Sequence, residues 1–239
     1  MHSRPRKVLA EFAGTFNIVF LTLVGIHVAA IMRSSAPSPA TRPLLVAALH
    51  AGFAYAASIA AFGHVASGLF NPAVTVARWV THRFSTFDTL LHGAAQLGGA
   101  TAAVYALRLL GDSVDALGPP SLTAGVTRGQ AMLIEGSMTF VLVLTLWATV
   151  ADRVRPRYWL AGIVAGVVVA VASFAGGPFT GGSMNPARAF GPALASRQWT
   201  QQAIYWIGPL AGGVAAASLY DLLFHRARPA PEETHGDGY

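Results

Sequence analysis

The sequence predicts an all-α membrane protein of six transmembrane helices and two half-length helices, arranged as an inverted internal repeat. Three observations predict this fold. The 239 residues are 54% hydrophobic and only 11% charged, with a mean hydropathy of +0.51. Six apolar segments are long enough to span a bilayer, and two shorter ones each begin with Asn-Pro-Ala. Soluble domains carry roughly 25% charged residues, so we expect this chain to lie in lipid.

The six long segments satisfy the length rule for a membrane span, which is about 20 mostly apolar residues. They are Val8–Met32, Pro43–Phe62, Phe87–Leu110, Gln130–Ala151, Tyr158–Ala175 and Gln201–Phe224. The two shorter segments, Asn71–Val80 and Asn185–Ala195, have about half of that length. Neither of them can cross the bilayer alone.

The basic residues predict the orientation of the spans. Most of them fall on one side of a six-span arrangement: Arg4, Arg6, Lys7, Arg78, Arg83, Arg153, Arg155, Arg157, Arg226 and Arg228. The positive-inside rule then places both termini in the cytoplasm, with residues 225–239 as a polar cytoplasmic tail. Because the basic residues are scattered singly and form no patch, the formal charge of +6 does not indicate a nucleic-acid partner.

Three landmarks recur along the chain in the same order. They are Glu-x-x-x-Thr-Phe at Glu11 and Glu135 (offset 124), Asn71-Pro72-Ala73 and Asn185-Pro186-Ala187 (offset 114), and Gly98-Gly99 and Gly212-Gly213 (offset 114). We therefore divide a single domain, residues 1–239, into repeat 1 (about 8–110) and repeat 2 (about 130–224). Each repeat holds an odd number of spans, so the two repeats face in opposite directions, as in membrane proteins that build solute sites from broken helices.

The two Asn-Pro-Ala sequences indicate helix starts inside the membrane. Proline is tolerated in the first helical turn, and asparagine caps that turn. The inverted repeat brings the two N-termini together, and each carries roughly half a positive charge that repels cations. The amides of Asn71 and Asn185 can donate hydrogen bonds to a neutral solute. Backbone carbonyls before each motif can accept them: Ser67, Gly68, Leu69, Gly181 and Ser183.

These motifs resemble those of the aquaporin (major intrinsic protein) family. The stretch from Gly63 to Thr75, GHVASGLFNPAVT, is similar to the first family signature, and GSMNPAR, ending at Arg188, is similar to the second. Leu69 departs from the pattern because a histidine is commoner there. The resemblance implies a right-handed bundle of six helices with two half-helices. It also implies a homotetramer in a lipid bilayer, with one pore for water and small neutral solutes in each subunit.

The resemblance also implies a selectivity filter formed by four residues. Arg188 lies three residues after Asn185 and matches the family's filter arginine; the other three matches are Gly182, Ser173 and Ala51. These small residues predict a wide, polar ring that resembles the filter of plant nodulin-like intrinsic proteins. We expect a channel for glycerol or metalloid hydroxides (boric, silicic or arsenous acid). The alternatives are a water-selective aquaporin and a junctional membrane protein with little permeability.

Glu11, Glu135 and His64 are predicted to have supporting roles. The symmetric placement of the two carboxylates favours hydrogen bonds to the loops before the half-helices, and His64 is expected to be a structural hydrogen-bonding residue. We assign no catalytic residue, metal site or cofactor, since the sequence offers no nucleophile elbow or clustered ligands. The chain contains no cysteine. A carrier is disfavoured because acidic residues are nearly absent from the spans. A bacterial inner membrane is the expected location.

Overall fold

The computed structural model describes residues 2–35, 41–66, 70–109, 119–151 and 157–224. Within these residues it forms eight α-helices and one π-helical turn that extends the fifth helix. The elements are α1 (Arg4–Ser35), α2 (Thr41–Ala66), α3 (Pro72–Val80), α4 (Thr86–Arg108), α5 (Arg128–Leu146), η2 (Trp147–Ala151), α6 (Tyr158–Thr180), α7 (Pro186–Ser196) and α8 (Gln202–Phe224). The predicted all-helical architecture is therefore confirmed.

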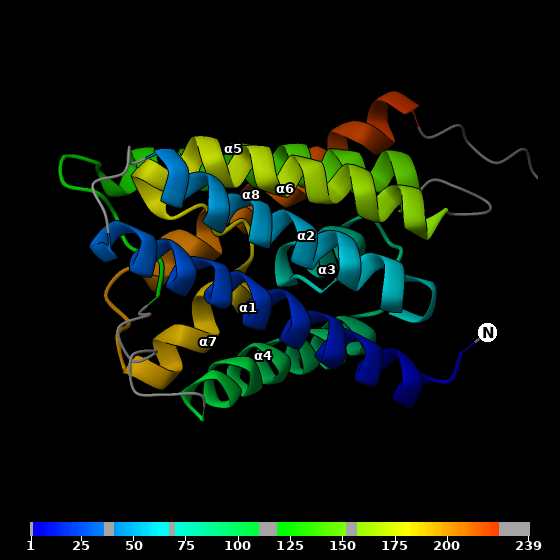
Figure 1. Cartoon of the computed structure of the whole chain (residues 1–239). Helices are drawn as coiled ribbons and strands as arrows, with labels where there is room; N and C mark the ends of the chain where they lie inside the picture. Colours follow the sequence, from blue (N-terminus) through cyan, green and yellow to red (C-terminus); the bar gives the residue numbers. More distant parts are fainter. Residues whose placement is uncertain (1, 36–40, 67–69, 110–118, 152–156, 225–239) are drawn as a thin grey trace, which may run out of the picture.

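The six long helices run side by side, and the short helices α3 and α7 enter the bundle from opposite ends (Figure 1). Helix α3 points toward the end at which the N-terminus lies. Helix α2 packs against α1 and α6, α5 against α8, and α1 against α4. This arrangement places the two half-helices between the repeats.

Glycines allow the long helices to approach closely at the boundary between the repeats. A Cβ atom on Gly52 would lie 2.5 Å from the Gly166 carbonyl oxygen, and one on Gly166 would lie 2.7 Å from the Gly52 oxygen. The two glycines are separated by the repeat offset of 114 residues. Helices α2 and α6 therefore meet backbone to backbone across the pseudo-two-fold axis, as small residues permit in membrane helices.

Five helices of the described chain are long and apolar enough to cross a membrane, namely α1, α2, α5 with its extension, α6 and α8. Helix α4 has 23 residues, which is also enough for a span, but it is less apolar. It carries His92 and Gln96, whose side chains are buried inside the protein. The sixth predicted span is thus present as a helix with two polar residues that face inward.

Helix α6 is longer than the sequence predicted. We expected it to end at Ala175, before the Gly-Gly-Pro sequence, but it continues to Thr180 and contains Pro178. A proline near the end of a helix removes only one backbone hydrogen bond. The helix ends instead at Gly181, which adopts the left-handed conformation (φ 79°) and donates its N–H to the Gly177 carbonyl. The loop before the second Asn-Pro-Ala is therefore only a few residues long.

Candidate functional site: a path between the half-helices

The two half-helices begin with the same cap. The Asn71 side-chain oxygen accepts a hydrogen bond from Ala73 N at 2.9 Å, and that of Asn185 accepts one from Ala187 N at 3.0 Å. A proline follows each cap, at a position where a backbone N–H would have no partner within the helix. Both asparagines are buried. The caps fix the side-chain oxygens against the helix ends and leave the amide nitrogens free to donate elsewhere.

Those amide nitrogens connect the two repeats. Asn71 Nδ2 donates to the Met184 carbonyl at 2.9 Å, and Asn185 Nδ2 donates to the Phe70 carbonyl at 3.0 Å. Phe70 and Met184 directly precede the two motifs and have positive φ angles of 44° and 54°, which non-glycine residues adopt at a cost. Neither residue was predicted from the sequence, although each directly precedes an asparagine that was predicted to cap a half-helix.

The buried carboxylates hold the backbone before each half-helix. Glu135 accepts hydrogen bonds from Met184 N at 2.7 Å, Ser183 N at 2.9 Å and the Thr180 hydroxyl at 2.7 Å. Glu11 accepts from Phe70 N at 2.7 Å and from the Gln96 side chain at 2.9 Å. Each repeat therefore uses its own glutamate to hold the residue whose carbonyl receives the other repeat's asparagine.

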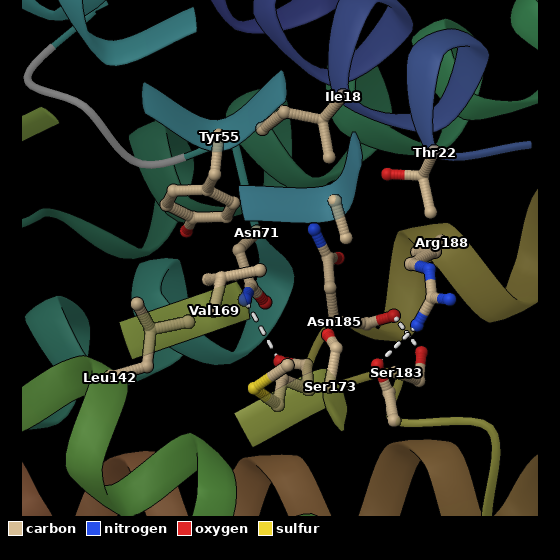
Figure 2. A pocket seen from close by; sticks show the side chains of 13 residues that line it. Ile18, Thr22, Tyr55, Asn71, Leu142, Val169, Ser173, Ser183, Asn185 and Arg188 are labelled. Carbon is tan, nitrogen blue, oxygen red and sulfur yellow. Dashed lines mark hydrogen bonds between the residues drawn. The ribbon is translucent and has the colours of Figure 1, made fainter. Parts of the chain in front are cut away.

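A narrow cavity lies between the asparagines and the predicted filter (Figure 2). Its volume of about 10 Å³ is enough for about one water molecule. The hydroxyls of Thr22 and Ser173 are buried without a hydrogen-bond partner in the described part of the chain. The cavity is lined by Ile18, Thr22, Ala51, Tyr55, Asn71, Leu142, Val169, Ser173, Gly182, Ser183, Met184, Asn185 and Arg188. It combines apolar walls with a few polar atoms.

All four predicted filter residues line this cavity. Three of them, Ala51, Ser173 and Arg188, also line a wider vestibule of about 600 Å³, so they lie where the vestibule narrows. The Arg188 guanidinium donates to the Gly182 carbonyl and, at 3.3 Å through Nη2, to the Gly181 carbonyl. These bonds hold the charge at the narrowing, although Arg188 makes no ion pair within the described residues.

The remaining predicted site residues are placed as follows. Gly181 lines the vestibule, while its carbonyl accepts from Arg188, and Ser183 lines the cavity. His64 is exposed, and its ring lies edge-on to that of His2, with 6.2 Å between the ring centroids. Residues 67–69, which include the predicted carbonyls of Ser67, Gly68 and Leu69, lie outside the described residues, as does the predicted tail 225–239.

Comparison with known proteins gives consistent matches over most of the chain. The family model described as "MIP: Major intrinsic protein" matches residues 2–220. Aquaporin TIP4-4 of Zea mays is 39% identical over 219 residues, which cover 92% of this chain and 86% of that protein. Probable aquaporin TIP4-1 of Oryza sativa subsp. japonica is 40% identical over 228 residues, with 92% and 87% covered.

A solved structure supports the fold independently. The X-ray structure of the aquaglyceroporin from Plasmodium falciparum aligns with a TM-score of 0.79 at 20% identity and covers 92% of this chain and 97% of that one. At this identity the likeness shows the fold and does not extend to the transported solute.

These comparisons refine two expectations from the sequence. The relatives named above carry the TIP designation, so they do not support the predicted resemblance of the filter to that of nodulin-like intrinsic proteins. They come from plants, and a bacterial inner membrane therefore finds no support in them. The family consists of channels, which agrees with the prediction that the chain is not an enzyme. With the family model matching nearly its full length, this multi-pass membrane protein belongs to the major intrinsic protein family.

Proposed function

We propose that this protein is a passive water channel. The observation that carries the proposal is the cavity beside Asn71, Asn185 and Arg188, which has a volume of about 10 Å³ and therefore admits about one water molecule at a time. The relatives that are about 40% identical are named aquaporins, which supports water over the larger solutes that the sequence alone favoured.

The lining chemistry suits single-file water. Hydroxyls of Thr22 and Ser173, which lack protein partners among the described residues, can exchange hydrogen bonds with a passing water molecule, because a buried polar group gains from any available partner. The apolar side chains between them offer nothing that would hold water tightly. Polar and apolar groups thus alternate along the path. The hydroxyls replace part of the hydrogen bonding that a water molecule loses on entry, and the apolar groups do not hold it there.

Two positive features oppose the passage of cations. The N-termini of α3 and α7 face the middle of the path, and each contributes roughly half a positive charge. Arg188 adds a full charge at the narrowing. A hydronium or alkali ion would meet both features in a region where water is scarce and charges are poorly screened.

A second candidate is a channel for glycerol or metalloid hydroxides. It is favoured by one observation, the small side chains of Ala51, Ser173 and Gly182 at the narrowing. Glycine and alanine leave room that an aromatic residue would fill.

Stopped-flow light scattering on proteoliposomes distinguishes the candidates. Water, glycerol and boric acid permeability would be compared with that of empty vesicles, and the Arg188→Leu variant serves as the filter control. Fast water flux with background glycerol and boric acid flux is the expected result. Fast solute entry beside water would establish the second candidate. Background flux for all three, from correctly assembled protein, would contradict both and leave a junctional role.

For assembly and location we propose a homotetramer in a cell membrane, with both termini in the cytoplasm. The family resemblance implies the tetramer, and the excess of arginine and lysine on one side of the spans supports the orientation. Each subunit would then hold its own path between α3 and α7. Cross-linking in the membrane and protease access to the N-terminus test these two statements.

A further inference from the structure

Arg78 occupies a position in repeat 1 that has a defined counterpart in repeat 2. It lies in the last turn of α3, and the repeat offset of 114 residues matches it to Pro192 in α7. Pro192 and Arg188, one turn apart, both line the vestibule. Since the repeats are inverted, Arg78 corresponds to a vestibule residue at the opposite mouth of the path, the end toward which α3 points.

The surroundings of Arg78 indicate a charge that is held in place without being neutralised. Its guanidinium stacks on the Phe84 ring at 4.9 Å from the centroid, and its Nε is buried with no hydrogen-bond partner in the described residues. The two ion pairs found in that part of the chain, Arg4–Asp88 and Arg83–Asp221, do not include it. An arginine at membrane depth is costly unless it faces water or a partner.

Neighbouring residues provide a second reason for this placement. Arg83 is close enough to act electrostatically on Arg78, and it is itself paired with Asp221 through two hydrogen bonds of 2.5 and 2.8 Å. Glu11 and Tyr158 also act electrostatically on Arg78, and the Glu11 carboxylate accepts hydrogen bonds from Phe70 N and the Gln96 side chain. Arg78 forms no ion pair within the described residues and is partly exposed, so water at the mouth of the path is the available solvent for the guanidinium.

We propose that Arg78 lines the cytoplasmic mouth of the path and acts there as a second cation-excluding, selectivity-determining residue. This inference rests on the proposed channel function. Repeat 2 carries its arginine three residues after the asparagine, and repeat 1 carries its arginine seven residues after it. One guanidinium therefore lies at each end of the path, and the N-termini of the two half-helices lie between the two guanidinium groups.

Because the chain contains no cysteine, a single introduced cysteine directly tests whether position 78 faces the path. Arg78→Cys, in proteoliposomes exposed on both faces to a membrane-impermeant methanethiosulfonate, is expected to be labelled and to lose water permeability severalfold. Wild type and Thr86→Cys, an exposed site just beyond α3, should conduct as before. An unlabelled Arg78→Cys, or a labelled one with unchanged flux, would overturn the proposal. Absent flux in wild type would instead overturn the channel function.

The contribution of the Arg78 charge to cation exclusion is tested in the Arg188→Leu variant. Adding Arg78→Leu should raise potassium leak about tenfold over Arg188→Leu alone. The reason is that removing a positive charge a few ångströms from the potassium ion lowers the electrostatic barrier that the ion meets. Adding Arg78→Lys, which keeps the charge, should not. Equal leak in all three variants would show that Arg78 only anchors α3. This comparison also decides the question if Arg78→Cys does not assemble.

Discussion

The Asn71 amide nitrogen lies 2.9 Å from the carbonyl oxygen of Met184, which belongs to the other repeat. Asn185 makes the equivalent bond to Phe70 at 3.0 Å. Each asparagine therefore caps its own helix with the oxygen and ties down the opposite loop with the nitrogen. Because all of these atoms are buried, the pair fixes the distance between the two half-helices.

Asn71→Asp keeps the capping oxygen and removes the amide donor. The new carboxylate faces the Met184 carbonyl and adds negative charge where two helix N-termini meet. We expect slower water flux and a measurable sodium or potassium leak, since the electrostatic barrier is partly cancelled. Ion flux from proteoliposomes, with wild type as reference, measures the effect. A variant that conducts water normally and excludes ions would show that Asn71 does not face the permeating solute.

Glu135→Gln replaces an acceptor by an amide donor beside the N–H groups of Ser183 and Met184. A buried N–H left without an acceptor costs about 1–3 kcal/mol, so we expect a clearly lower melting temperature in detergent and reduced water flux. Thr145→Val, at a half-buried position further along the same helix, is the control and should change neither. Wild-type stability in Glu135→Gln would mean that the loop before α7 is held by other contacts.

Ala51→Phe places an aromatic ring where the vestibule narrows. The side chain would fill the space that the small filter residues leave open, so glycerol flux should fall more than water flux if any glycerol passes. Water flux should fall by at least about tenfold if the cavity already admits only one molecule. Ala57→Phe, on an exposed face of the same helix, should have little effect. Unchanged fluxes in Ala51→Phe would remove Ala51 from the filter.

Two glycines of α4 are predicted to respond oppositely to alanine. A Cβ on Gly99 would collide with the Phe12 carbonyl oxygen of α1, whereas a Cβ on Gly93 meets nothing within 4 Å. Gly99→Ala should separate α1 from α4 and lower thermal stability. Gly93→Ala should leave stability unchanged or raise it by about 0.5–1 kcal/mol, as expected for a glycine within a helix. Unfolding temperatures of the purified variants test both statements, and equal values would indicate that α1 and α4 tolerate separation.

The half-helices show how far local sequence information reaches. Asn-Pro predicted their starts, and the observed helices, Pro72–Val80 and Pro186–Ser196, differ from the predicted segments by no more than one residue at either end. The cap and the proline act within one turn, so the signal is local. The end of α6 was mispredicted because Gly-Gly-Pro suggests a break, whereas packing and the left-handed Gly181 determine where the helix stops.

The sequence by itself determined the membrane class, the inverted repeat and the two capped half-helices, because each follows from composition, length or neighbouring residues. Only the tertiary structure decided that Phe70 and Met184 receive the opposite asparagines, that the hydroxyls of Thr22 and Ser173 face one cavity, and that this cavity is narrow. These facts depend on distances between segments more than a hundred residues apart or on separate helices. Such distances are set by helix packing, which depends on how all contacting side chains fit together.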